Sequence, residues 1–453
     1  MPLRSLATAF TALLVIAGCA QVPTAEPETT AQAEPPAVQP APPPSVDAPA
    51  PPPEQASVPE PPPPPADVWA RMRPSFRLTP LATPLVQEWE QYYAKRPDYV
   101  ARMVERGSRY LYHVIEEVER RRMPAEVALL PMIESAYNPQ AYSRAHASGM
   151  WQFIPSTGKL YGLRQNYWYD GRRDVLAATS AALDYLEKLH GMFNDWNLAL
   201  AAYNWGEGAV SRAIARNQAK GLPTDYESLT MPAETRNYIP KLQAVRNIIA
   251  NPEQFGITLA SVPNKPYFTT VTTPHHIDVK LAAKFAEMPM EEFRFLNPAH
   301  NKAVIKAEGA AETIVLPIEK VAVFQRNLQA HDKPFVSWQA YTVKRSDKPD
   351  QIAAKHGMTL AQLYEVNGIT GKKKIVPGQT ILVPHKGTAE PNLPDLPAPK
   401  ITVARAKPTK TRCVQVKDGV RKVVSCPTKK KSGSKTQSVK KSSPTVQARA
   451  SGG

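Results

Sequence analysis

Between residues 68 and 252, apolar residues recur at the spacing of amphipathic helices rather than in the alternation of strands. One segment shows this most clearly, and its apolar stripe consists of Val175, Ala182, Leu183, Leu186 and Leu189. Asp174 precedes the stripe as a cap or first-turn acid, and Gly191 follows it. The pattern predicts a helix between these two residues, within a mostly helical first half of the chain.

Two further helices are predicted in this half. Pro124 stands at the head of one, which runs toward Glu134, and Pro139 interrupts it because the residue before a proline avoids the helical conformation. Another runs from Asp195 to Tyr203 and is rich in alanine. We therefore expect Glu134 near a helix end, facing a loop.

The second half carries shorter patterns of the order strand, helix, helix, strand. The better-defined one begins at Tyr341, passes an Asn367-Gly368 turn and closes with an apolar strand at 376–384. A weaker copy would have strands at 268–271 and 314–317, with helices at 281–285 and 293–296. The predicted fold class is therefore α+β.

Composition separates both ends from these domains. The chain of 453 residues has 48 prolines, a net charge of +16 and a pI of about 9.6. Residues 20–66 hold almost no large apolar side chain, so they predict an extended, proline-rich disordered linker that reaches on the order of 100 Å. Residues 386–453 predict a basic, mostly disordered tail.

The first 19 residues have the pattern of a secretory signal. Arg4 precedes a short apolar stretch that ends in small residues directly before Cys19. This pattern favours lipidation of Cys19 over simple cleavage near Ala17, and thus a membrane anchor through lipid. The residues after Cys19 include no aspartate retention signal, which favours an outer-membrane lipoprotein facing the periplasm.

Export also changes the interpretation of the tail. A basic tail suggests nucleic acid, but an exported chain meets anionic envelope polymers instead, so no nucleic-acid partner is expected. Cys413 and Cys426 flank an alternating segment around an Asp-Gly turn, which predicts a hairpin. A disulfide between them is plausible in an oxidising compartment, and two free thiols are the alternative. No Cys or His spacing suggests a metal, His275-His276 being a solvated loop pair, and no cofactor is expected.

Glu134 is the candidate catalytic residue. Its neighbours Pro131, Met132, Ile133 and Tyr137 are largely apolar, and an apolar lining disfavours the charged carboxylate. Its pKa should therefore rise toward the range of a general acid. Asp170 and Asp174 are the nearest other acids, but beside Arg172 and Arg173 they are expected to form ion pairs.

Four motifs around this acid resemble, in order, those of the goose-lysozyme-like lytic transglycosylases, which cut peptidoglycan. They are Glu134-Ser135 with Asn138-Pro139, Gly149-Met150-Trp151-Gln152, Ala202-Tyr203-Asn204, and Tyr238 after Glu234-Thr235-Arg236-Asn237. Within these enzymes the chain is most similar to the membrane-bound murein transglycosylase D group, which the segment 169–174 and a LysM-like second half also suit.

The resemblance implies a mechanism with one carboxylate. Glu134 would protonate the glycosidic oxygen of the β-1,4 bond between MurNAc and GlcNAc, and then remove the proton of the C6 hydroxyl, which closes a 1,6-anhydro ring. The resemblance also implies polar or saccharide-facing roles for eight residues: Ser135, Ser143, Met150, Trp151, Gln152, Tyr203, Asn204 and Tyr238.

The resemblance divides the chain into a lysozyme-like domain at 67–255, a degenerate LysM-like module at 265–320 and a LysM module at 339–385. LysM modules bind GlcNAc-containing chains, although Ser346-Asp347-Lys348 replaces the usual Gly-Asp-Thr. Two other functions compete: a hydrolytic muramidase on the same scaffold, and a catalytically inactive wall-binding lipoprotein. The sequence leaves open whether cleavage is endolytic or exolytic.

Overall fold

The computed structural model describes residues 65–273, 275–307, 312–369, 374–387 and 391–397, together with the backbone of 412–417 and 420–425. The predicted signal peptide with Cys19, nearly all of the predicted linker and Cys426 lie outside these residues. Helices and small antiparallel sheets make up the described part, which confirms the α+β class.

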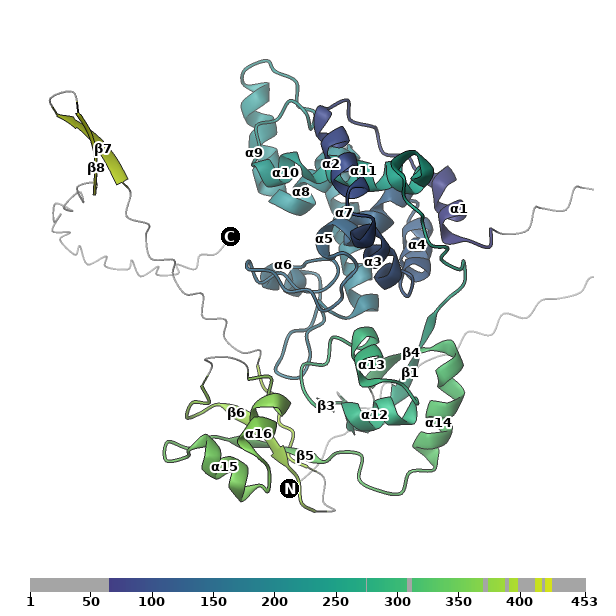
Figure 1. The fold of residues 1–453 in the computed structure, drawn as a ribbon, viewed down its shortest axis with the longest axis vertical. Helices are drawn as coiled ribbons and strands as arrows, with labels where there is room; N and C mark the ends of the chain where they lie inside the picture. The colour runs from purple at the N-terminus through teal and green to yellow at the C-terminus, as the bar shows by residue number, and fades with distance from the viewer. Residues whose placement is uncertain are drawn as a thin grey trace, which may run out of the picture. The chain divides into compact units, whose positions relative to one another are not determined.

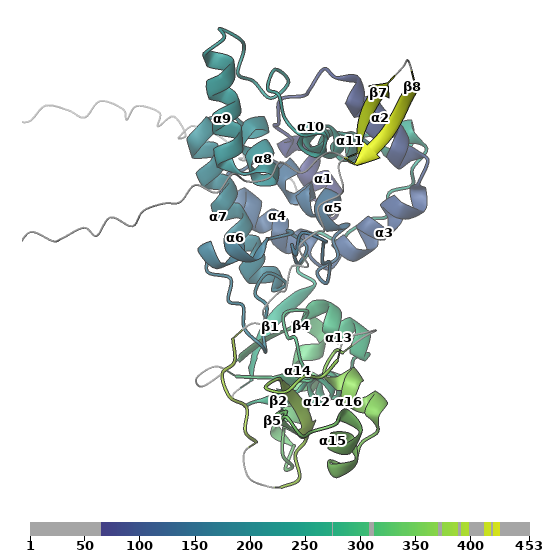
Figure 2. The ribbon, with the colours of Figure 1, turned by 90° about the vertical axis from the view of Figure 1, so that its left-hand side faces the viewer.

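The first part is helical (Figure 1). Its helices are α1 (Val68–Met72), α2 (Pro84–Ala94), α3 (Pro97–Gly107), α4 (Leu111–Arg120), α5 (Leu130–Ser135), α6 (Pro155–Leu160), α7 (Val175–Phe193), α8 (Trp196–Trp205), α9 (Glu207–Gln218), α10 (Ala233–Arg236) and α11 (Tyr238–Ala250). Short 3-10 turns lie at Arg73–Ser75, Ala125–Leu129 and Pro252–Phe255. Helices α2 and α11 lie side by side in both views (Figures 1 and 2).

Helices α7 and α8 are both capped by an aspartate, and the cap of α7 is the Asp174 that the sequence predicts. Asp174 accepts a hydrogen bond from the backbone N–H of Ala177, and Asp195 accepts one from Leu198. Helix α7 continues through Gly191 and ends at Asn194, whose φ of 49° is left-handed. A glycine inside a helix costs only about 1 kcal/mol, so it does not terminate a helix whose apolar stripe is buried.

The segment that leads to Glu134 is not one helix. A 3-10 turn at Ala125–Leu129 is followed by the six-residue helix α5, which ends because Ala136 and Tyr137 adopt φ values of 53° and 54°. Tyr137 is fully buried and donates its hydroxyl to the carbonyl of Ala128 at 2.6 Å. The helix therefore stops before Pro139, at a buried tyrosine anchor rather than at the proline.

Two βααβ units follow. In the first, β1 (Phe268–Thr273) pairs antiparallel with β4 (Glu312–Pro317) around α12 (Val279–Phe285) and α13 (Met290–Leu296). It also contains the short pair β2 (Ile277–Asp278) and β3 (Val304–Ile305), a 3-10 turn at Ile318–Lys320 and α14 (Val321–Gln329). In the second, β5 (Trp338–Thr342) pairs with β6 (Thr380–Pro384) around α15 (Pro349–Lys355) and α16 (Leu360–Val366).

The two units have one feature in common, a buried asparagine that bonds to the backbone of the closing strand. Asn297 exchanges two hydrogen bonds with the backbone of Val315, and Asn367 exchanges two with Leu382, in each case on the closing strand. Each asparagine thus ties the end of the second helix to the last strand. The weaker sequence copy therefore has the same local structure as the stronger one.

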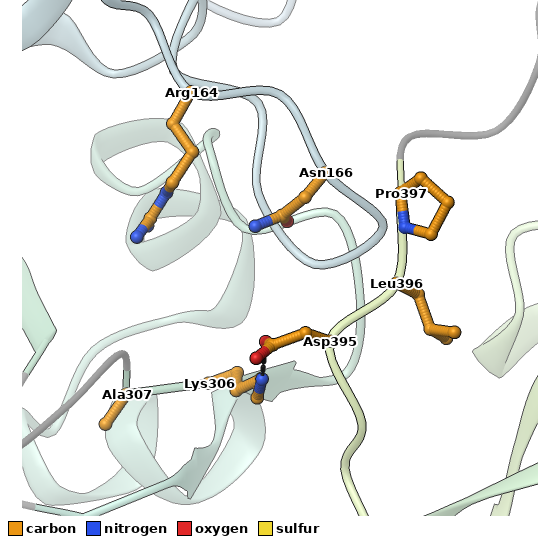
Figure 3. Close-up of a pocket in the computed structure, with 7 residues that line it drawn as sticks. All are labelled: Arg164, Asn166, Lys306, Ala307, Asp395, Leu396 and Pro397. Atoms are coloured by element: carbon orange, nitrogen blue, oxygen red, sulfur yellow. Dashed lines mark hydrogen bonds and ion pairs between the residues drawn. The ribbon is translucent and has the colours of Figure 1, made fainter.

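Residues 391–397, which we call the strap, lie within the tail that begins at 386, and they pack against the preceding domains. Leu393 is buried in a cluster with Tyr167, Trp168 and Leu382. Trp168 donates its ring N–H to the carbonyl of Pro394 at 2.9 Å. An open cavity of about 500 Å³ lies beside these contacts, where Lys306 forms an ion pair with Asp395 of the strap (Figure 3). The composition of residues 391–397 predicts a solvated segment. Composition cannot show that apolar surface elsewhere in the fold is available for this segment to cover.

Farther along, β7 (Arg412–Lys417) pairs antiparallel with β8 (Val420–Ser425), across the Asp-Gly step where the sequence predicts a hairpin turn. Cys413 lies opposite Val424 in this pair. Because Cys426 lies outside the described residues, the disulfide stays a prediction.

Candidate active site

A cleft of about 470 Å³ in the helical domain gathers the motifs. Its walls come from α5, the loop after it, α7, α8 and the start of α11. The described lining residues are Ile133, Glu134, Ser143, Ala145, Ala147, Gln152, Phe153, Ile154, Thr157, Tyr185, Tyr203, Asn204, Trp205, Gly206, Glu234, Tyr238 and Lys241. Six of the nine predicted catalytic and saccharide-facing residues are therefore brought together.

Glu134 is the penultimate residue of α5 and accepts a hydrogen bond of 2.5 Å from the hydroxyl of Tyr238. Burial raises the pKa of Glu134 to about 7, against the hydrogen bond from Tyr238, which lowers it. The charge of Glu234 raises the pKa further and that of Lys241 lowers it. At neutral pH both protonation states of Glu134 are populated, so this carboxyl can donate and accept a proton.

The loop after α5 presents Ser143 and Gln152 to the cleft. Gln152 has a left-handed φ of 51°, and its side-chain amide donates to the carbonyl of Gly149 at 2.7 Å. The hydroxyl of Ser143 accepts the backbone N–H of Ala147 at 3.1 Å. A non-glycine residue with positive φ costs free energy that the surrounding structure must offset, and such residues occur at functional sites.

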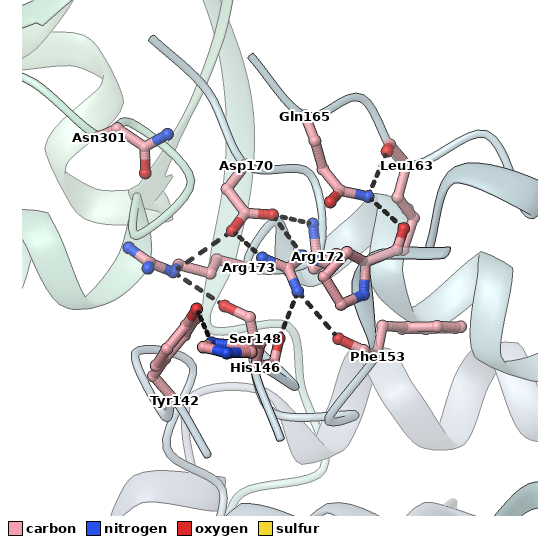
Figure 4. A network of polar contacts seen from close by, with 12 residues as sticks. Tyr142, His146, Ser148, Phe153, Leu163, Gln165, Asp170, Arg172, Arg173 and Asn301 are labelled. Atoms are coloured by element: carbon pink, nitrogen blue, oxygen red, sulfur yellow. Dashed lines mark hydrogen bonds and ion pairs between the residues drawn. The ribbon is translucent and has the colours of Figure 1, made fainter. Parts of the chain in front are cut away.

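A buried arginine supplies that support (Figure 4). Arg172 is 4% exposed, forms two hydrogen bonds with the carboxylate of Asp170, and donates to the carbonyls of His146 and Phe153. Arg173 donates to the hydroxyl of Ser148 at 3.0 Å. Asp170 is thus an ion-pair partner, and Asp174 is a helix cap that also accepts the hydroxyl of Tyr169. Neither aspartate lines the cleft.

The other polar residues of the cleft are also held by neighbours. Tyr203 donates its hydroxyl to the carbonyl of Trp151 at 2.9 Å, and it lines the cleft together with Glu134. The side-chain oxygen of Asn204 accepts the hydroxyl of Thr235 at 2.8 Å. These contacts position the α8 wall of the cleft.

Three predicted saccharide-facing residues are not at the cleft surface. Met150 is 1% exposed and Trp151 is fully buried, with its ring N–H donating to the hydroxyl of Thr179. Ser135 donates its hydroxyl to the carbonyls of Pro131 and Met150. Met150 and Trp151 follow the turn at Gly149 and point into the core, whereas Gln152 reaches the cleft. Ser135 lies on α5, before this loop, and is half-buried.

Sequence reasoning missed two charged residues of the cleft, Glu234 and Lys241. Lys241 lies three positions after Tyr238 on α11, a spacing that shares a helix face, so helical periodicity could have indicated it. Glu234 lies on the preceding helix α10, where this periodicity does not apply. Glu234 is exposed at the cleft and Lys241 is half-buried.

Membrane-spanning helices and metal-binding clusters are both absent from the described residues. None of the helices in this part of the chain has the length and apolarity that a membrane span requires. Likewise, no three or more His, Cys, Asp or Glu side chains of the described segments are grouped so as to hold a metal ion.

Three family models match successive parts of the chain. The Transglycosylase SLT domain family matches residues 104–224, the LysM-like domain of lytic transglycosylase MltD matches 267–333, and the LysM domain matches 341–384. The chain is 33% identical over 339 residues to Membrane-bound lytic murein transglycosylase D of Escherichia coli (strain K12), which covers 72% of this chain and 75% of that protein.

Two other similarities are more local. A protein described as a tributyltin chloride resistance protein, from Alteromonas sp. (strain M-1), is 47% identical over 126 residues, 28% of this chain and 61% of that protein. The crystal structure of the 70 kDa soluble lytic transglycosylase from Escherichia coli matches with a TM-score of 0.23 and 23% identity, covering 29% of this chain and 22% of that one.

A transglycosylase domain followed by LysM-type modules, in a chain similar to lytic murein transglycosylases, defines a peptidoglycan lytic transglycosylase, a lyase. Among these enzymes, the chain belongs to the membrane-bound lytic murein transglycosylase D family.

Proposed function

We propose that this enzyme cleaves the β-1,4 bond between MurNAc and GlcNAc with Glu134 as its sole acid and base, and that it leaves a 1,6-anhydro-MurNAc end. The observation that carries the proposal is the position of Glu134 in the cleft, where the desolvation of its half-buried carboxyl raises its pKa to about 7. A carboxyl with this pKa can serve first as acid and then as base at neutral pH.

In the first step protonated Glu134 donates its proton to the glycosidic oxygen, and the bond to the anomeric carbon breaks with its electron pair leaving on that oxygen. The 2-acetamido oxygen of MurNAc stabilises the positive anomeric carbon. In the second step the Glu134 carboxylate removes the proton of the C6 hydroxyl, whose oxygen bonds to the anomeric carbon. The proton on Glu134 is restored and no water is consumed.

The remaining cleft residues would orient the acid and the sugar. Tyr238 holds the Glu134 carboxyl through its 2.5 Å hydrogen bond. The oxygen of the Gln152 amide and the hydroxyl of Ser143 would contact the N-acetyl group, and Asn204 would line the same wall. These roles are what the family resemblance implies, and the positions of the residues in the lining of the cleft support them.

The deciding experiment combines a substitution with product analysis. Glu134→Gln should lower the rate of peptidoglycan cleavage by about a hundredfold or more, since general acid catalysis contributes that much. Mass spectrometry of the wild-type digest should show muropeptides that are one water lighter than hydrolysed ones. Full activity in the Glu134→Gln variant would contradict the acid assignment.

Glu234 gives the hydrolytic alternative a specific test, because it is the other carboxylate among the described residues of the cleft. A hydrolase would need a second carboxylate to activate water. Hydrated products that disappear in Glu234→Gln would establish a muramidase, whereas anhydro products that persist in this variant support the single-carboxylate mechanism. In the same assay, cleavage of peptidoglycan by the wild-type protein would exclude the third function, that of a catalytically inactive wall-binding protein.

The similarity to membrane-bound murein transglycosylases supports association of the enzyme with the cell envelope. We propose that Cys19 is lipidated and anchors the enzyme at the outer membrane facing the periplasm, that the linker spans the distance to the wall, and that the basic tail contacts anionic envelope polymers. Peptidoglycan itself is the partner of the LysM modules. Cys19→Ser should move the enzyme from the membrane fraction to the soluble periplasmic fraction, and unchanged fractionation would contradict the anchor.

A further inference from the structure

Lys241 is the one cationic side chain among the described residues that line the cleft. It lies on α11 one helical turn after Tyr238. Its ammonium nitrogen is 4.6 Å from the centroid of the Trp89 ring, on α2. The ring is fixed in turn, since its N–H donates to the side-chain oxygen of Asn237 at 2.8 Å. The ammonium is therefore held at a defined place beside the acid.

No carboxylate of the described residues forms an ion pair with this ammonium. By contrast, Lys188, on α7, pairs with Glu207 at 3.1 Å, and Lys306 pairs with Asp395. A half-buried cation whose contact inside the protein is an aromatic face keeps its N–H donors available to an anion in the cleft.

The positive charge of Lys241 disfavours the protonated form of Glu134. Its charge lowers the pKa of Glu134, whereas protonated Glu134 is the form that donates. A cation at this place thus costs some of the acid population at neutral pH, which indicates that it serves another purpose. The glycan backbone itself is uncharged, so a cation gains nothing from the sugar rings.

Murein does carry anions next to the bond that is cut. The lactyl ether on C3 of MurNAc ends in a carboxylate when it bears no peptide, and in an amide followed by peptide carboxylates when it does. Hydrogen bonds between an ammonium and a carboxylate are stronger than neutral ones.

We infer that Lys241 is a specificity-determining residue that binds a carboxylate of the C3 substituent of MurNAc in the cleft. The inference rests on the proposed function, because it places MurNAc beside Glu134. It predicts that the enzyme prefers strands whose C3 substituent is anionic over strands in which the same carboxylates have been converted to amides.

The test uses the full-length enzyme and four substrates: peptide-free glycan strands, strands with uncross-linked peptides, and both after carbodiimide-driven amidation of their carboxylates. The preference is the ratio of kcat/KM for the native strand to that for its amidated form. Lys241→Met keeps an aliphatic stem against Trp89 and removes the charge, so it should lower the preference about tenfold, mainly through KM. Lys241→Arg should retain most of it, and Lys188→Met, a charge loss outside the cleft, should leave it unchanged.

A loss of preference with peptide-free strands identifies the lactyl carboxylate as the ligand, and a loss with peptide-bearing strands identifies the peptide carboxylates. An equal effect of Lys241→Met on native and amidated strands would overturn the inference and assign Lys241 to Glu134 or to packing. Glu134→Gln separates the two proposals: if it still cleaves all four substrates, the proposed function fails, whatever the preference of Lys241→Met.

Discussion

Glu134 and Tyr238 are 104 positions apart in the chain, and their side chains share one hydrogen bond. This bond stabilises the carboxylate, while burial destabilises it, and burial is the larger effect on the pKa. The tyrosine therefore keeps the pKa of Glu134 near neutrality while it fixes the direction of the carboxyl. The same side chain thus contributes to both geometry and acidity.

Replacing Tyr238 by Phe should shift the pH dependence of activity. Because protonated Glu134 is the acid, kcat/KM falls as the pH rises through its pKa of about 7. Removing a hydrogen bond that lowers this pKa raises it, so the alkaline limb should move to higher pH by roughly one unit, with a lower maximal rate. A pH profile of peptidoglycan cleavage measures both effects.

The matched control is Tyr203→Phe, whose lost hydroxyl bonds to the carbonyl of Trp151 and not to Glu134. Its alkaline limb should stay in place. A limb that moves equally in both variants would contradict a specific role for Tyr238 in setting the pKa.

At the scale of elements, the loop between α5 and α6 contributes Ser143, Gln152 and Phe153 to the lining of the cleft. Arg172 donates hydrogen bonds to the carbonyls of His146 and Phe153 in this loop. The loop turns at Gly149, whose φ is 81°. A Cβ on Gly149 would lie 1.8 Å from the carbonyl oxygen of Arg172, so backbone must move to admit a side chain. The close approach of the two segments requires glycine here.

Gly149→Ala should therefore destabilise the protein by about 3 kcal/mol or more, and it should lower activity by displacing Gln152. Gly162→Ala is the control: its φ of 74° is also left-handed, but nothing lies within 4 Å of the added Cβ. That variant should cost about 1 kcal/mol. Chemical denaturation measures the free energy of unfolding of both variants. Equal destabilisation would show that the left-handed φ, and not the close approach to Arg172, requires glycine at position 149.

At the scale of the whole molecule, the loop at 163–170 of the helical domain forms hydrogen bonds with both modules that follow. Trp168 accepts the backbone N–H of Asn301 at its carbonyl, and the hydroxyl of Tyr167 donates to the carbonyl of Thr380. The strap adds backbone contacts to the same loop, where the N–H of Tyr167 donates to the carbonyl of Leu396. These contacts join both LysM-type units to the enzyme domain.

Leu393→Ala should loosen this junction, because a buried leucine contributes about 2 to 5 kcal/mol to packing. Amide hydrogen exchange should accelerate in the loop at 163–170, in β6 and in the strap, and should stay unchanged in α7 and α8. Asp395→Asn should have little effect, since its side chain is 85% exposed and exposed ion pairs contribute little. Uniform acceleration through the helical domain would contradict a local role.

Several features were decided by the sequence itself. Helical periodicity with a capping residue predicts α7, an apolar, alanine-rich run predicts α8, and short apolar runs beside turn residues predict the strands of both βααβ units. These signals depend on near neighbours in the chain. The apolar residues around Glu134 likewise predict a raised pKa, since its own helix and loop supply part of its lining.

Tertiary structure decided which side chains share the cleft. Trp151 was expected at the saccharide surface and is buried against Thr179, while Lys241 was missed and lies beside the acid. The strap was expected in solvent and covers Tyr167 and Trp168. Burial depends on segments that are distant in sequence, and neither composition nor periodicity records which of them pack together.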